Sequence, residues 1–275
     1  MKATLILENG SVFQGQSIGA ADERVCEMVF NTSMVGYQEI LTDPSYAGQG
    51  IVMSYPLIGN YGVNHEDNES SRPWAEAFVV RHLSRRGSNF RCEGDLDDYL
   101  KTNGITGIQG VDTRALTRIL RSQGTMNGMI TCAEDFSMEE ALEKIRAYRV
   151  RGTVERVSRK EVQVYPALKR QKLRVALMDF GVKENMIRCL QERGCEVTVF
   201  PAHTTCVEIL AGNFDGVMLS NGTGDPADNK AIIAEIQDLY ASGIPIFAVC
   251  LGHQLMALAT GAQTRKMRFG HRGAN

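Results

Sequence analysis

The second half of the chain alternates short apolar runs with amphipathic segments. The apolar runs have the length of buried strands, and the amphipathic segments have the spacing of short helices. The predicted strands are residues 173–181, 195–201, 214–222 and 244–249, and the predicted helices are residues 183–194, 205–213, 228–243 and 251–261. Strands and helices in this order form right-handed crossovers, which place helices on both faces of a parallel sheet. We therefore predict a doubly wound, mostly parallel α/β domain over residues 172–275.

The first part of the chain lacks this regular alternation and favours a mixed β/α domain. A hairpin is predicted around Asn9 and Gly10, because Asn-Gly between apolar runs is a strong turn signal. Residues 110–125 predict a helix that begins at an aspartate or threonine cap and stops at glycine, and residues 137–148 predict another. We therefore expect a separate N-terminal domain over residues 1–150.

Residues 151–171 differ from both flanking regions, because they are basic, polar and poorly periodic. We interpret them as a linker that carries one edge strand. The length of 275 residues agrees with two domains, since a single core rarely organises so long a chain.

The composition excludes several classes of partner. Hydrophobic residues make up 43% of the chain and charged residues 23%, so the material for a core is ample. The formal net charge is −2, which gives no general attraction to nucleic acid or to an anionic membrane. No apolar run approaches the roughly 20 residues that a membrane-spanning helix needs. We therefore expect neither nucleic acid nor membrane as a partner.

The seven cysteines are scattered, and no two of them form a CxxC pair. This spacing fits neither a secreted disulfide framework nor a zinc site. The N-terminal residues lack the apolar core of a signal peptide. A reducing cytoplasm is therefore the expected location, and no metal site is predicted.

One cysteine stands where a predicted strand meets a predicted helix, in IPIFAVCLGHQ, residues 244–254. A side chain on such a turn projects above the carboxyl edge of the sheet, as nucleophiles do in strand–turn–helix arrangements. The helix N-terminus favours the thiolate of Cys250, and the amide of Leu251 can donate to a developing oxyanion. The same pattern also fits a small buried cysteine at a strand end.

A second turn, LSNGTGDP at residues 219–226, follows the preceding predicted strand and should lie beside Cys250. Gly222 and Gly224 allow the backbone to approach a bound group and to direct N–H donors toward it. The alternative is an ordinary turn ahead of a helix, with an aspartate cap and a proline in the first turn. The loop does not fit a phosphate-binding P-loop, because it lacks Gly-Lys-Ser/Thr.

Together, LSNGTGDP and FAVCLGHQL resemble the class I, triad-type glutamine amidotransferases. Within that group the chain is similar to the small-subunit family of carbamoyl phosphate synthetases. The resemblance covers nearly the whole chain. It extends to VFNTSMVGYQEILTDPSYAGQGIVMSYPLIGNYGVN, to DTRALTRILRSQGTMNG and to MDFGVKENMIRCLQERGCEVTVFPA.

This resemblance implies glutamine hydrolysis through a cysteine thioester, with ammonia channelled to a large subunit that uses ATP and bicarbonate. It implies a heterodimer that serves pyrimidine and arginine biosynthesis. No cofactor is expected in this chain, because ATP and metal are expected on the large subunit. The N-terminal domain is implied to dock the partner and to contribute to the glutamine site.

Individual roles follow from the same resemblance. Cys250 matches the nucleophile, and Gly222 and Leu251 match the two amides of the oxyanion hole. The positions that match the binding of L-glutamine are Ser45, Gly222, Gly224, Leu251 and Gln254.

The general base is the point at which the sequence departs from the family. The family uses a histidine, oriented by a glutamate, in a His-Pro-Glu-like motif near the C-terminus, and this sequence contains no such motif. We therefore expect an incomplete triad, a C-terminally truncated amidotransferase domain and an exposed flank of the sheet. His253, His271 or a partner are the alternatives as a source of the base, which thioester chemistry requires.

Two further interpretations stay open at this point. The chain could be a catalytically incompetent fragment or docking module, because the histidine and glutamate of the triad are absent. It could also carry other thiol chemistry, as a hydrolase or a redox sensor on a related α/β fold. The resemblance of NTSMVGYQEILTDPSY argues against this last interpretation, because that domain has no role there.

Overall fold

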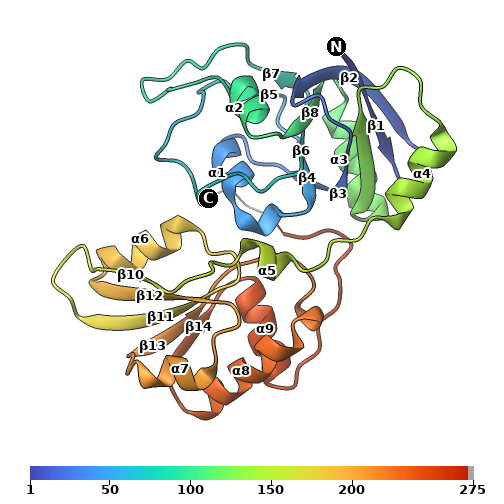
Figure 1. Cartoon of the computed structure of the whole chain (residues 1–275). Helices are drawn as coiled ribbons and strands as arrows, with labels where there is room; N and C mark the ends of the chain where they lie inside the picture. Colours follow the sequence, from blue (N-terminus) through green and yellow to red (C-terminus); the bar gives the residue numbers. More distant parts are fainter. Residues whose placement is uncertain (272–275) are drawn as a thin grey trace. The chain divides into compact units, whose positions relative to one another are not determined.

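The hairpin predicted around Asn9 and Gly10 is present, and it opens a closed barrel in the computed structural model, which describes residues 1–271. Gly10 has a φ of 84°, the left-handed conformation that such a turn needs. The order of the strands is β1-β2-β8-β6-β4-β3-β9, and β9 pairs antiparallel with β1 to close the barrel (Figure 1). The strands are β1 (Lys2–Leu7), β2 (Val12–Gly19), β3 (Arg24–Asn31), β4 (Gln49–Met53), β6 (Ala77–Val80), β8 (Thr106–Gln109) and β9 (Met126–Thr131).

Both helices predicted in this region are confirmed. Asp112 caps the first of them, since its carboxylate accepts a hydrogen bond from the Ala115 amide at 2.9 Å, and Gly124 ends it. Ser137 caps the second. The further elements around the barrel are α1 (Tyr37–Thr42), the 3-10 helix η1 (Pro44–Tyr46), β5 (Leu57–Ile58), β7 (His82–Leu83), α2 (Leu96–Thr102), α3 (Thr113–Gln123) and α4 (Met138–Ala147).

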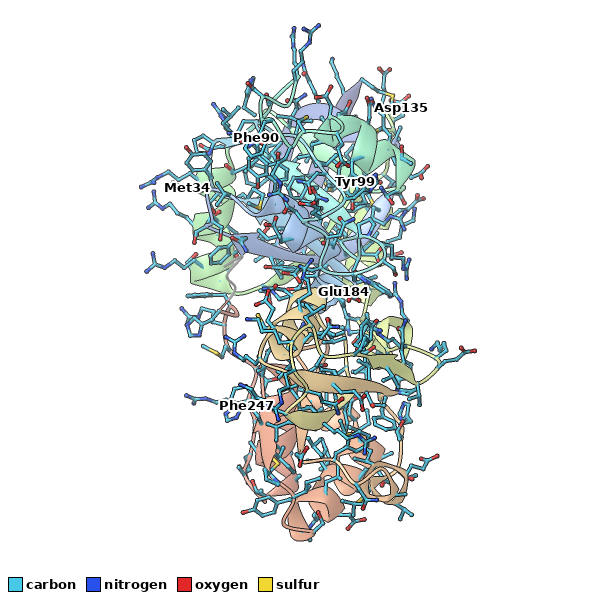
Figure 2. The ribbon with its side chains drawn as sticks, turned by 90° about the vertical axis from the view of Figure 1, so that its left-hand side faces the viewer. Met34, Phe90, Tyr99, Asp135, Glu184 and Phe247 are labelled. Carbon is cyan, nitrogen blue, oxygen red and sulfur yellow. The ribbon has the colours of Figure 1, made fainter. Side chains whose placement is uncertain are left out.

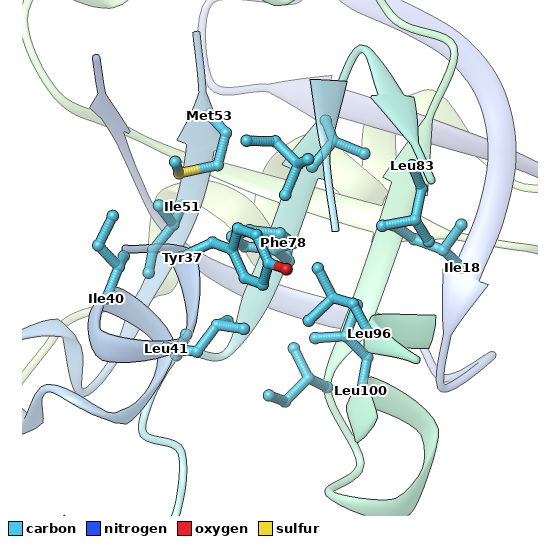
Figure 3. Close-up of a cluster of buried hydrophobic side chains, with 14 of the residues drawn as sticks. Ile18, Tyr37, Ile40, Leu41, Ile51, Met53, Phe78, Leu83, Leu96 and Leu100 are labelled. Atoms are coloured by element: carbon cyan, nitrogen blue, oxygen red, sulfur yellow. The ribbon is translucent and has the colours of Figure 1, made fainter. Parts of the chain in front are cut away.

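Two hydrophobic clusters stabilise the barrel on its two sides. Alternate residues of the strands, such as Leu5 of β1, form one cluster together with Leu116 and Leu120 of α3. The residues of opposite parity, such as Phe78 of β6, form the other cluster with Tyr37 of α1 and with α2 (Figure 3). A third, smaller cluster joins Ile6 of β1 and Met129 of β9 to α4, whereas β2 keeps alternate side chains exposed.

The second part of the chain forms the predicted doubly wound sheet. The order of its strands is β10-β12-β11-β13-β14, and all of these pairs are parallel except the antiparallel pair of β10 and β12. One face packs against α5, α7, α8 and α9, and the other packs against α6. The elements are α5 (Thr153–Val157), β10 (Gln163–Tyr165), β11 (Leu173–Asp179), α6 (Glu184–Glu192), β12 (Cys195–Pro201), α7 (Cys206–Ala211), β13 (Gly216–Leu219), the 3-10 helix η2 (Pro226–Asp228), α8 (Lys230–Ala241), β14 (Ile246–Ala248) and α9 (Leu251–Ala259).

The segment 151–171 is the place where the structure differs from a simple linker. The contacts divide the described chain into Met1–Val150 with residues 267–271, and Arg151–Lys266, so the segment belongs to the second unit. The expected edge strand, β10, is present, but the segment also forms the helix α5. Its attachment is partly polar, because Thr153 Oγ1 donates to the Thr223 carbonyl at 3.1 Å, and partly apolar, because Val154 is buried in the cluster that covers the sheet. A helix of five residues is too short for hydrophobic periodicity to predict it.

The edge of the sheet at β14 is exposed, as expected from the sequence. Within the described residues β14 pairs with β13 alone, and the Phe247 side chain is 67% exposed (Figure 2). No helix within residues 1–271 is both long enough and apolar enough to cross a membrane.

A pair of phenylalanine substitutions tests the assignment of the core. Phe78 is fully buried and Phe90 is 97% exposed (Figure 2). We expect Phe78→Ala to lower the free energy of unfolding by about 3–5 kcal/mol, because a large cavity remains. The matched variant Phe90→Ala should change it by no more than about 0.5 kcal/mol. Urea unfolding followed by the fluorescence of Trp74, the one tryptophan of the sequence, reports on this unit; equal losses in the two variants would contradict the assignment.

Candidate active site

Cys250 lies on the turn between β14 and α9, with a φ of 52° and a ψ of −113°. Together with Asn213 it is one of two non-glycine residues with positive φ within residues 1–271. A side chain in this region of backbone space costs about 1–3 kcal/mol, so the surrounding structure must impose the conformation. Such strain occurs most often at functional sites.

The packing of α9 against β13 imposes this turn. The Gly252 amide donates to the carbonyls of Ser220 and Val249, both at 3.0 Å. A Cβ on Gly252 would lie 2.5 Å from the carbonyl oxygen of Leu219, so no other residue fits without a shift of the helix. The chain turns sharply at Cys250, two residues after β14 ends.

The environment of Cys250 differs from that of the other cysteines. All seven lie within the described residues, and only Cys250 is exposed. Burial raises the pKa of the Cys26 and Cys206 thiols, which disfavours their reactive thiolate forms. The interpretation of Cys250 as a small buried residue is therefore wrong, and its thiol is accessible at the N-terminal end of α9.

The loop after β13 runs beside the first residue of α9. A Cβ on Gly222 would lie 2.7 Å from Leu251 Cδ2 and would overlap the carbonyl oxygen of Phe180. Gly224 has a φ of 96°, and a Cβ there would lie 2.5 Å from Thr153 Oγ1. The two glycines are thus required by close contacts, and they bring this backbone next to the turn at Cys250.

Buried polar side chains that sequence analysis did not single out hold this edge of the sheet. Ser220 Oγ accepts a hydrogen bond from the Phe180 amide at 2.9 Å and donates to the Asn221 carbonyl at 2.7 Å. Asp179 Oδ1 accepts from the amides of Gly181 and Val182 at 2.9 and 2.8 Å. Each of these polar residues directly follows or ends an apolar strand, which was the available signal in the sequence.

The alternative interpretation of this loop as a capped turn also holds. The Asp225 carboxylate accepts a hydrogen bond from the Ala227 amide at 3.0 Å, and Pro226 begins η2. Capping fixes the end of the loop and leaves Gly222 in place beside α9. The two interpretations of the segment are therefore compatible.

The remaining predicted residues lie at different places. Leu251 is buried as the first residue of α9, and the amide of Gln254, whose side chain is exposed, donates to the Cys250 carbonyl at 3.0 Å. His253 is exposed on the same helix. Ser45 is half-buried in η1 of the first unit, where its amide donates to Asp43 Oδ1 at 2.8 Å. His271 is exposed at the end of the described chain.

This arrangement can perform nucleophilic attack on a carbonyl carbon. The thiol of Cys250 is exposed at the N-terminal end of α9. The amides at the start of α9 and the neighbouring loop around Gly222 are the type of donor that stabilises an oxyanion. The site therefore favours acyl transfer through a covalent cysteine intermediate.

Comparison with known proteins gives two family matches. Residues 5–130 match the family described as "Carbamoyl-phosphate synthase small chain, CPSase domain", and residues 176–275 match "Glutamine amidotransferase class-I". These two matches cover the barrel and the sheet that carries Cys250.

Similar proteins are the carbamoyl phosphate synthase small chains of Clostridium perfringens and Bacillus caldolyticus. The first is 49% identical over 100% of this chain and 77% of the relative, and the second is 50% identical over 100% of this chain and 74% of the relative. A Bacillus subtilis protein named "Carbamoyl phosphate synthase pyrimidine-specific small chain" is 46% identical over 100% of this chain and 74% of the relative.

The strained turn can be tested by the relative stability of two substitutions. We expect Cys250→Gly to be more stable than Cys250→Ala by about 1 kcal/mol, because glycine adopts positive φ freely and alanine does not. At Cys189, inside α6, the order should reverse, with alanine more stable than glycine by about 1 kcal/mol. Urea unfolding followed by circular dichroism measures both differences. The same order at the two positions would contradict the turn.

Proposed function

The chain belongs to the carbamoyl phosphate synthase small-chain family, and we propose from this membership that it hydrolyses glutamine at Cys250 and supplies ammonia to a large synthetase subunit. The observation that carries the proposal is the exposed thiol on a strained turn, inside a class I glutamine amidotransferase domain. The exposed thiol and the strained turn would not be sufficient without the domain match, because each of them also occurs in other classes of protein.

The first step forms a thioester. The Cys250 thiolate attacks the carbonyl carbon of the glutamine side chain, and the carbonyl oxygen becomes an oxyanion. The amides of Gly222 and Leu251 are the proposed donors to this oxyanion. The C–N bond then breaks, and the nitrogen leaves as ammonia once it has received a proton. Gly224, Gln254 and Ser45 are the further proposed ligands of glutamine.

The second step restores the thiol. Water loses a proton to a base and attacks the thioester carbon, the C–S bond breaks, and glutamate leaves. His253, His271 and a partner chain are the proposed alternatives as the source of the base. His253 is three residues from Cys250 on α9, which makes it the first candidate to test.

The alternative of a catalytically incompetent docking module is less well supported. It has no need of an accessible thiol, and it does not account for the packing of Gly252 that creates the turn. The amidotransferase match over residues 176–275 also favours the hydrolytic function.

The partner, the pathways and the location that we propose for this chain rest on the same family membership. We propose a heterodimer with the large subunit, on which ATP is consumed, and a role in pyrimidine and arginine biosynthesis. The pyrimidine assignment is supported by the name of the Bacillus subtilis relative. A reducing, cytoplasmic location is supported by the free state of all seven cysteines.

Ammonia release from glutamine tests the proposal directly. We expect release by this chain together with a carbamoyl phosphate synthase large subunit, and a loss of at least about a thousandfold in Cys250→Ala, because the nucleophile is removed. Cys189→Ala is the matched control and should keep full activity. Release that is unchanged in Cys250→Ala would disprove the assignment of the nucleophile.

The mass of the intact protein separates the two steps. If His253 acts as the base for the second step, His253→Gln should accumulate the glutamyl thioester, seen as one added glutamyl group. A variant that turns over normally would remove His253 from the mechanism. The proposed function would be disproved if the wild-type chain, with the large subunit present, formed no thioester and released no ammonia.

A further inference from the structure

A large groove lies on the outer face of the barrel in the first unit. It has a volume of about 1080 Å³, and its walls come from β1, β2, the segment around β7 and the segment that leads into α4. None of the residues proposed to bind or hydrolyse glutamine lines it. The groove therefore needs an explanation of its own.

Three cationic side chains line the groove without a carboxylate partner. Lys2, Arg81 and Arg85 are all exposed, and none of them forms an ion pair within residues 1–271. Glu134 is the one acidic side chain among the lining residues. The groove thus carries an excess of positive charge, whereas the chain as a whole has a net charge of −2.

The segment that carries the two arginines is fixed in place. The Gly110 amide donates to the Arg81 carbonyl at 3.0 Å, and the Leu83 amide donates to Gln109 Oε1 at 3.2 Å. Gln109 pairs in register with Gln16, which pairs with Lys2 across β1 and β2. Lys2, Gln16 and Gln109 are therefore cross-strand neighbours on β1, β2 and β8, and Gln109 holds the segment that carries the arginines. Because this backbone is already ordered, ligand binding costs less backbone entropy.

The other wall of the groove is partly apolar. Phe136 and Met138 line it at the start of α4, and Val12 lines it from β2. A groove lined by cationic, aromatic and aliphatic side chains suits a ligand with an anionic end and an apolar body. Arginine binds phosphate through parallel N–H donors, so a phosphate group is the anion that best matches Arg81 and Arg85.

We propose that this groove binds a small molecule that carries a phosphate group on an apolar body, with Arg81, Arg85 and Lys2 as the ligands of the phosphate. The volume of about 1080 Å³ is slightly above the roughly 300–1000 Å³ that is usual for small-molecule sites, so the ligand would fill part of the groove. The proposal goes beyond the glutaminase function and does not depend on it.

Phenyl phosphate is the probe that tests this site. At low ionic strength it should bind the whole chain in calorimetric titration and raise the Tm, and it should bind more tightly than inorganic phosphate, because its ring contacts the apolar wall. Arg81→Gln and Arg85→Gln should each weaken binding by about tenfold or more, the loss expected for one charge-assisted hydrogen bond.

Arg86→Gln is the matched control, because Arg86 is exposed next to Arg85 and does not line the groove. It should leave the affinity within about twofold, a difference well below that of one such hydrogen bond. The Tm without ligand shows that each variant is folded.

Several results would overturn the proposal. No heat and no Tm shift at millimolar phenyl phosphate would remove the site. An equal loss in Arg86→Gln would show that the binding is diffuse. Malonate that binds as tightly as phenyl phosphate would overturn the phosphate assignment, and a hexaglutamate peptide that binds more tightly than either would show a surface for an acidic protein segment instead.

Discussion

The close approach of α9 to β13 is the contact on which the site depends. Gly252 lies against the backbone of Leu219 with no room for a side chain, and its amide bonds to Ser220. This contact fixes the residue at which α9 begins. The chain enters the helix through Cys250, whose φ is 52°. The same helix start brings Leu251 against the loop at Gly222. One packing constraint therefore produces the exposure of the thiol and the position of its neighbours.

The second unit could be predicted because its signals are local. Each strand of the parallel set is a short apolar run, and each helix has its own amphipathic pattern, so order and direction follow from chirality. The barrel could not be predicted in this way. Several neighbouring strands pair in parallel without regular helical crossovers, and β1 finds its partner β9 more than a hundred residues later. The segment 151–171 was interpreted as a linker because its helix α5 has five residues, too few for a periodic pattern.

The candidate site was predictable in part. Cys250 and Gly222 follow from the turn pattern, because the carboxyl ends of neighbouring parallel strands meet at one edge. Asp179 and Ser220 were not singled out, since a polar residue after an apolar run is common and only the hydrogen bonds in the folded chain reveal their role. Ser45 rests on the resemblance alone, because it belongs to a different unit and no local pattern connects it to the thiol.

The closure of the barrel between β1 and β9 sets an order of events during synthesis. The first strand ends at Leu7 and its final partner ends at Thr131, so the barrel cannot close until that whole length has left the ribosome. At roughly 5–20 residues per second, the β1–β2 hairpin waits on the order of ten seconds for β9. Until β8 is made, the edge at β2 is unpaired as well. Such an edge is open to pairing with other nascent chains until β9 arrives. The first unit is therefore most vulnerable to aggregation before its last strand is made.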